Sequence, residues 1–319
     1  MLPKLSPPAL LCLLGVLALA CVVGFMTLGA NGHWDFVLSF RSGKLAAMLL
    51  VAYCVAVSSV LFQTITHNRI LTPSIMGFDA LYTLIQAVAI FWFGMNMGGQ
   101  LGVTGKFVLE VCVMTVFACL LFQWIFSGAA HSLHLLLLVG IVFGLLFRSL
   151  SGLMIRMIDP NEFLFLQDKM FASFNSIRTN LLLASTVMVA GVSVIGWRLR
   201  RAYDVLSLGR EVAVNLGVHY RKTLWLTLLL IAVMVSVSTA LVGPVTFFGL
   251  LVSNLAYMIM QTDKHKFTVP AAVLLGIVAL VGGQTVLEHG LGLNTTVSVV
   301  IEFAGGLMFI ALIVRKGQR

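Results

Sequence analysis

The stretch Leu45–Ile65, LAAMLLVAYCVAVSSVLFQTI, contains no charged residue and decides the class of fold. It is long enough to cross a hydrocarbon core of about 30 Å as a helix. In lipid only helices or closed barrels satisfy the backbone polar groups, and continuous apolar blocks indicate helices rather than barrel strands. Nine more blocks of this kind give about ten predicted spans, of which the eighth is marginal in length. The other nine are Ala9–Leu28, Ile75–Phe93, Phe107–Phe126, Leu133–Leu153, Leu181–Trp197, Thr223–Val242, Val245–Met260, Val269–Leu287 and Val297–Val314.

Composition excludes the soluble classes of protein. Hydrophobic residues make up 60% of the 319 residues, charged residues 10%, and mean hydropathy is +1.06. Soluble domains are about half apolar and about a quarter charged. The five cysteines are an odd number, too sparse for a secreted disulfide scaffold. We therefore expect one all-helical integral membrane domain over residues 1–319.

The basic residues predict the orientation of the chain. Thirteen of the 20 fall inside when the N-terminus is placed inside, six fall outside, and Arg148 lies within a span. Positive residues favour the cytoplasmic side, so the N-terminus and the C-terminus are both predicted inside. The net charge of +9 follows largely from this bias, which leaves nucleic acid a poor partner. Lys4 and Ala20-Cys21 resemble a lipoprotein signal, but the apolar run continues past Cys21, so the first block is taken as a span.

The longest inside loop, residues 198–222, reads RLRRAYDVLSLGREVAVNLGVHYRK. We predict a short helix with Ser207 as its N-cap and Gly217 at its end. Leu208, Val212 and Leu216 recur every four residues and form an apolar stripe, while Gly209 permits close backbone approach. Flanked by Arg210 and Glu211, such a helix fits a groove on another protein. A helix lying on anionic lipid headgroups is the alternative, and the residues alone leave both open.

The longest outside stretch covers residues 154–180. Pro160 breaks the chain, and aromatic residues then alternate with polar ones such as Asp168 and Lys169. This mixture favours a short helix that lines a substrate passage over one that only covers the bundle. The residues predicted to line the passage are Phe163, Phe165, Met170, Phe171, Phe174 and Asn175.

Two helix starts are marked by Pro and Gly. Pro73 and Gly77 stand at the third span, and Gly243-Pro244 precedes the eighth. Each follows the second helix of a five-helix set, and they lie on opposite sides of the membrane. This pattern predicts an inverted repeat. In addition, Gly140 and Gly144 form a GxxxG pair, which predicts close helix packing.

Ionisable residues inside the bilayer are costly unless they are paired or face water. Asp79, Glu110, Arg148 and Glu302 lie in predicted spans, and either a functional role or structural pairing accounts for them. They form no ordered ladder of acids of the kind that a proton-driven transporter uses.

No catalytic motif is present in the sequence. Gly43-Lys44 and Gly105-Lys106 lack the Ser or Thr that a phosphate-binding loop needs, and no HExxH or GxSxG occurs. We expect no enzyme activity, no metal site and no bound cofactor. Uphill transport then needs an ion gradient or a separate ATPase. The rival interpretations are a gradient-driven secondary transporter and a membrane-embedded enzyme.

Several stretches resemble the FecCD family, the permease subunits of ABC importers for iron chelates and cobalamin. They are NRILTPSIMGFDALY at 68–82, DVLSLGREVAVNLGV at 204–218 and GPVTFFGLLVSN at 243–254. The first stretch is most similar to the catecholate-siderophore subgroup, which includes petrobactin-like importers. One departure concerns Ser253-Asn254, where the family often has Pro-His, and this weakens inferences about the eighth span.

The resemblance implies a type II ABC importer permease fold, like that of cobalamin importers, in the bacterial inner membrane. It assigns ATPase coupling to residues of the inside loop and docking of a substrate-binding protein to Arg41 and Lys44. The implied partners are a second permease (different rather than identical), two ATPase subunits that carry ATP and Mg²⁺, a periplasmic or lipoprotein binding protein, and lipid. The implied cargo is a ferric siderophore, with cobalamin or haem as alternatives. The implied coupling residues are Ser207, Leu208, Gly209, Arg210, Glu211, Val212, Ala213, Leu216 and Gly217.

Overall fold

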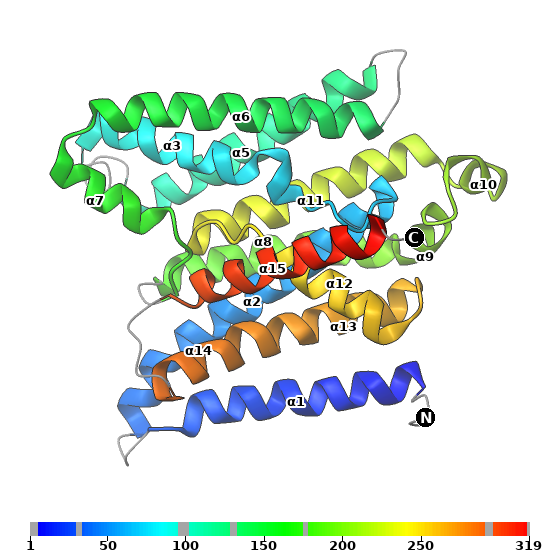
Figure 1. The fold of residues 1–319 in the computed structure, drawn as a ribbon, viewed down its shortest axis with the longest axis horizontal. Coiled ribbons are helices and arrows are strands. Elements are labelled where there is room, and N and C mark those ends of the chain that lie inside the picture. The colour runs from blue at the N-terminus through cyan, green and yellow to red at the C-terminus, as the bar shows by residue number, and fades with distance from the viewer. Residues whose placement is uncertain are drawn as a thin grey trace.

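A computed structural model describes residues 6–29, 34–94, 102–127, 133–174, 178–290 and 296–317. Every regular element in these ranges is helical (Figure 1). Seven helices are long and apolar enough to span a membrane, and three shorter apolar helices account for the third, eighth and tenth predicted spans. The bounds are α1 Pro7–Thr27, α2 Trp34–Thr66, η1 Pro73–Met76, α3 Phe78–Phe93, α5 Gly102–Ser127, α6 Leu133–Met157, α7 Pro160–Lys169, α8 Thr179–Arg198, α9 Arg200–Leu206, α10 Arg210–Asn215, α11 Tyr220–Val242, α12 Phe248–Met260, α13 His265–Ile277, η3 Val278–Gly282, α14 Gly283–Thr285, η4 Val286–Gly290 and α15 Val297–Gly317.

The packing of the helices agrees with an inverted repeat. The first half contains α1, α2, α3, α5 and α6, and the second contains α8, α11, α12, the continuous helix from α13 to η4, and α15. The second helix of each half packs on the fourth helix of the other, α2 on α13 and α11 on α5. Within each half the third helix packs on the fifth, α3 on α6 and α12 on α15. The two sets of contacts are equivalent, as two related halves require.

The two marked helix starts meet in the interior of the bundle. Gly77 precedes α3 with φ +95°, and Gly243 follows α11 with φ +104°, conformations that favour glycine. The Thr246 hydroxyl, just before α12, donates to Asp79 Oδ2 in the first turn of α3 at 2.7 Å. This bond joins the two halves and gives one oxygen of a carboxylate that the sequence placed in the bilayer a partner.

Glycines in α6 and α15 allow these helices to approach the two starts. A Cβ at Gly77 would lie 2.9 Å from the Gly144 Cα, and a Cβ at Gly305 would lie 2.7 Å from the Phe247 Cβ. Gly140 packs in the same way on Met76. The prediction of close packing at the GxxxG pair is therefore confirmed, and α15 repeats the arrangement in the second half.

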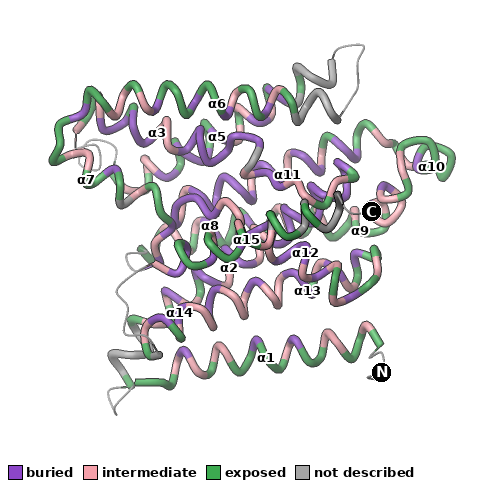
Figure 2. Tube along the Cα trace, viewed as in Figure 1, coloured by how far each residue is buried: buried purple, intermediate pink, exposed green. Residues whose placement is uncertain are grey.

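The core follows α2 and α11, whose residues are mostly buried, while α1 and the outer face of α6 are largely exposed (Figure 2). Figure 1 shows the start of α1 and the end of α15 at the same end of the bundle as α9 and α10, with α7 at the opposite end. A chain with both termini inside has this arrangement. We call the end with α9 and α10 the inner end and the end with α7 the outer end.

Some boundaries differ from the predicted spans. α12 begins at Phe248 because Gly243–Phe247 is not helical, so its 13 residues cover only about 20 Å. The ninth span is a continuous helix over His265–Gly290 in which η3 and η4 are π-helical turns. Hydropathy does not register this change in hydrogen bonding, because π turns leave the composition of a helix unchanged.

Candidate functional site

The inner end carries a short helix held by a buried anchor. Tyr203 and Leu206 in α9 are 5% and 1% exposed and belong to the main core cluster. Ala213 is the buried residue of α10 and belongs to the same cluster. α9 is therefore fixed to the bundle, and α10 touches it chiefly through one small side chain.

The outward surface of α10 is apolar. Leu208, Val212 and Leu216 are 59%, 42% and 61% exposed, and Val214 beside them is 53% exposed. The predicted stripe is thus exposed on the end of the bundle rather than packed into it. We call these four residues the coupling surface. Arg210 and Glu211 flank it, with the Arg210 guanidinium 6.0 Å from the centre of the Tyr220 ring.

The ends of α10 show one wrong prediction and one that is confirmed. Ser207 is not its N-cap: the Ser207 hydroxyl donates to the Asp204 carbonyl at 2.7 Å and closes α9. Gly209 takes the N-cap position because φ +100° and ψ 165° at this sharp turn exclude residues with a Cβ. At the other end, Gly217 N–H bonds to Val214 O and Val218 N–H to Ala213 O, both at 3.0 Å. These two bonds form a Schellman motif, so Gly217 ends the helix as predicted.

The outer end contains a cavity of about 410 Å³ among α3, α5, α7, α8 and α11. Of the residues predicted to line a passage, Phe165 and Phe171 line it. Phe163 is partly buried and packs against a small cluster that includes residues of α3 and α7. Met170 is exposed, and Phe174 is buried in a core cluster. Asn175 lies outside the described residues.

The charged side chains that line the cavity are mostly positive. Lys106, Lys169 and Arg178 line it together with one carboxylate, Glu110. Glu110 is buried, accepts a hydrogen bond from Gln86 Nε2 at 2.7 Å and lies 3.7 Å from Lys106 Nζ. Structural pairing therefore accounts for Glu110. The sequence did not show that these three cations share one site. Lys106, Lys169 and Arg178 are, however, three of the six basic residues that the predicted topology places outside, against the bias of basic residues toward the inside.

Arg41 and Lys44 have partners within the chain. The Lys44 ammonium is 7% exposed and forms an ion pair with Glu288, which also accepts from Gln284 Nε2 at 2.6 Å. The half-buried Arg41 donates to Phe25 O at 2.7 Å and so closes the end of α1. We therefore withdraw Lys44 from the predicted docking residues, because a buried, paired ammonium is not available to another protein. A docking role for Arg41 stays a prediction.

Polar contacts surround the other charges that were predicted in spans. Arg148 on α6 acts electrostatically on Asp79, and the Thr246 backbone hydrogen-bonds Glu302 on α15. These residues gather where the two helix starts meet. Thr246 therefore hydrogen-bonds both Asp79 and Glu302 and holds them where the two helix starts meet.

The fold and these sites define a multi-pass membrane protein with a short helix flanked by exposed apolar side chains at one end. The model of the FecCD transport family matches residues 9–315, so the chain belongs to this family. The petrobactin import system permease protein YclO of Bacillus subtilis is 47% identical, over 95% of this chain and 96% of that protein. The corresponding FatC of Bacillus anthracis is 36% identical, over 88% and 79%. A solved metal-chelate type ABC transporter in an inward-facing conformation shares the fold, with TM-score 0.82, 22% identity and coverage of 97% and 99%.

Proposed function

We propose that this chain is the permease subunit of an ABC importer that carries a ferric siderophore across the bacterial inner membrane, with a catecholate siderophore such as petrobactin as its cargo. The single observation that carries this proposal is the exposed coupling surface, because neither a secondary transporter nor an embedded enzyme needs it. The two petrobactin permeases above support the cargo. Relatives named for hemin and vitamin B12 transport are only 25% and 28% identical.

The energy comes from a partner subunit. FecCD members are permease subunits without catalytic activity, and this sequence has no phosphate-binding loop. We propose that α10 inserts Leu208, Val212 and Leu216 into a groove of the ATPase. Closure of two ATPase subunits on ATP then moves the inner end, and the permease pair changes the side to which its path opens.

The permease pair consists of two different subunits in our proposal, as the resemblance to siderophore importers suggests. A loaded binding protein docks at the outer end through contacts that include Arg41. The cavity at the outer end lies beside the path. Its excess of cations suits a ferric complex of catecholate groups, which carries negative charge because the doubly deprotonated catecholates bring more charge than Fe³⁺ neutralises.

Two experiments test the function. A deletion strain grown under iron limitation on single siderophores should lose growth on ferric petrobactin and keep growth on unrelated chelates. Purified Leu208→Asp permease should lose its ATPase during co-purification, because a carboxylate would be buried in an apolar groove. Leu164→Asp is the matched control: Leu164 is 65% exposed on α7 at the outer end, and this variant should retain the ATPase. Full retention by both variants refutes the coupling assignment.

A further inference from the structure

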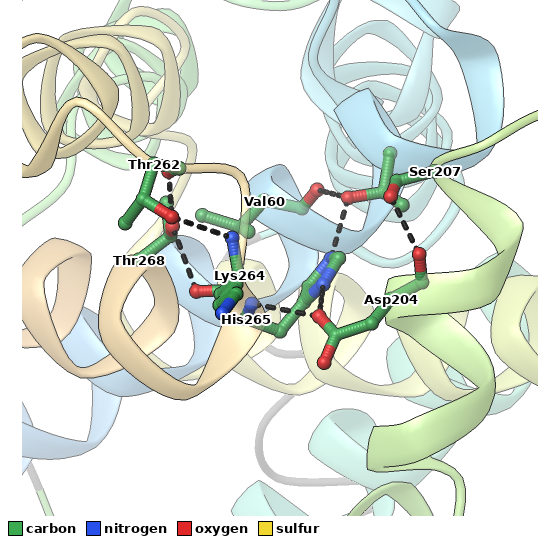
Figure 3. A network of polar contacts seen from close by, with 8 residues as sticks. Val60, Asp204, Ser207, Thr262, Lys264, His265 and Thr268 are labelled. Carbon is green, nitrogen blue, oxygen red and sulfur yellow. Dashed lines mark hydrogen bonds and ion pairs between the residues drawn. The ribbon is translucent and has the colours of Figure 1, made fainter.

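A hydrogen-bonded chain of three side chains joins α9 to two membrane helices (Figure 3). Asp204 Oδ1 accepts from the backbone N–H of His265 at 2.9 Å and from the ring Nδ1 of His265 at 2.7 Å. The other ring nitrogen, Nε2, lies 2.8 Å from the Thr64 hydroxyl near the end of α2. The three residues are far apart in sequence and meet only through the fold.

The chemistry of the chain fixes the direction of its bond to Asp204. A carboxylate only accepts, so the Nδ1 of His265 carries the proton that it donates to Asp204. The Thr64 hydroxyl has one proton and lies 2.8 Å from both Val60 O and His265 Nε2, so the neutral ring shares that proton with Val60 O, whereas a protonated ring donates from Nε2 to the Thr64 oxygen. His265 and Thr64 are both 6% exposed, so water competes little for the contact between them, whereas the Asp204 side chain is 45% exposed. Both ring nitrogens are thus engaged, and the ring has one orientation.

Asp204 also supplies the missing cap of α13. Lys264, at the N-cap position, makes no side-chain cap bond, and the first amide of the helix belongs to His265. That amide is one of the four that a helix leaves unpaired at its start. The cap therefore comes from α9, and a displacement of α9 acts directly on the first turn of α13.

We propose that Asp204, His265 and Thr64 form a positioning joint that transmits movement of α9 and α10 to α13 and α2. The inference rests on the proposed function. α9 is separated from α10 by only three residues, and the Ser207 hydroxyl ties that connection back to the Asp204 carbonyl. α2 and α13 pack on each other, and α2 packs on α11 in the core. Force applied to the coupling surface thus reaches the centre of the bundle through this joint.

The sharpest test compares two threonines of α2. Thr64 and Thr66 are both 6% exposed, and each hydroxyl bonds to the carbonyl four residues earlier, but only Thr64 contacts His265. The complete transporter, with its ATPase and partner permease, is reconstituted in vesicles, and the molecules of ferric petrobactin moved per ATP are measured. We expect Thr64→Val to lower this ratio at least fivefold and Thr66→Val to change it less than twofold.

The carboxylate gives a second comparison. Asp204→Asn keeps an acceptor for both donors of His265 and should stay within about threefold of the natural chain, whereas Asp204→Ala should lower the ratio at least tenfold. Both variants should co-purify with the ATPase. Equal ratios for the two threonine variants overturn the joint. Loss of the ATPase from Thr64→Val also overturns the joint, because the three hydrogen-bonded side chains would then only hold α10 in place for binding. If Asp204→Ala does not fold, the threonine pair decides.

A cargo-free measurement separates this inference from the proposed function. Spin labels on Val286, at the far end of the ninth span, and on Leu164 in α7 occupy positions that are 58% and 65% exposed at the outer end, and the distance between them reports movement that reaches this end. Trapping the ATPase with ATP should change this distance in Thr66→Val and leave it unchanged in Thr64→Val. If the complex shows this difference but transports no ferric petrobactin, the proposed cargo is wrong and the proposed joint is supported. The same change in both variants refutes the joint.

Discussion

Replacing Gly209 by alanine isolates the conformation of one residue. A Cβ at this position meets no atom within 4 Å, so the substitution causes no steric clash with the rest of the chain. The cost comes from φ +100° and ψ 165°, a region in which residues with a Cβ pay about 1–3 kcal/mol. α10 has six residues and one buried side chain, and a helix this short does not absorb such strain. The α10 helix should therefore leave its docking position.

The expected effect follows from the population of that position. At about 1.4 kcal/mol for each factor of ten, the strain lowers the equilibrium constant between the docked and the displaced arrangement of α10 by about fivefold to 150-fold. The apparent dissociation constant for the ATPase rises by up to the same factor, because only the docked arrangement binds. The assay is titration of the purified permease in nanodiscs with labelled ATPase. Gly191→Ala in α8, also free of contacts within 4 Å but helical, is the control and should bind normally. A normal dissociation constant for Gly209→Ala would refute the reasoning.

Three further substitutions test other parts of the structure. Lys44→Glu should lower thermal stability by less than the roughly 3–5 kcal/mol that breaking a fully buried ion pair costs, since Glu288 is 30% exposed. Combining it with Glu288→Lys should restore much of the lost stability, and a single variant as stable as the natural chain would contradict the pairing. Arg41→Glu should weaken binding of the substrate-binding protein most strongly at low salt, and unchanged uptake at low salt would remove Arg41 from the docking surface. Gly77→Ala should reduce the yield of folded protein in the membrane, because the new Cβ would lie 2.9 Å from the backbone of α6 and φ at this position is +95°. The control Gly152→Ala, whose Cβ meets no atom within 4 Å, should fold normally, and equal yields of the two variants would contradict the close packing.

The membrane fold could be predicted because the hydropathy of a segment indicates directly whether lipid or water surrounds it. The ten apolar blocks correspond to the seven long and three short helices. The repeat was visible at Gly77 and Gly243, two glycines before the third helix of each half, and both take a positive φ in the structure. The exposed apolar residues around α10 were predictable in part: the period of four at Leu208, Val212 and Leu216 predicted a helix face, but α10 covers only Arg210–Asn215, so Leu208 lies before the helix and Leu216 at its C-cap.

Tertiary contacts explain what the sequence did not show. Ser207 is a good N-cap residue by type, but the turn between α9 and α10 needs a positive φ, and only Gly209 provides it. Lys44 was placed correctly at the outer end, but its partner Glu288 lies in the ninth span. The two residues are 244 positions apart in the sequence, so no local sequence pattern predicts the ion pair. The joint at His265 and the cations of the cavity were missed for the same reason.

Transport by the purified permease pair in vesicles, with and without its ATPase, tests the central claim most directly. Ferric petrobactin is supplied on the outer face, with the binding protein, and ATP on the inner face. The account predicts uptake against a gradient only when the ATPase and ATP are both present, and its loss in Leu208→Asp. Sustained uphill uptake by the permeases alone, driven by an ion gradient, would contradict it.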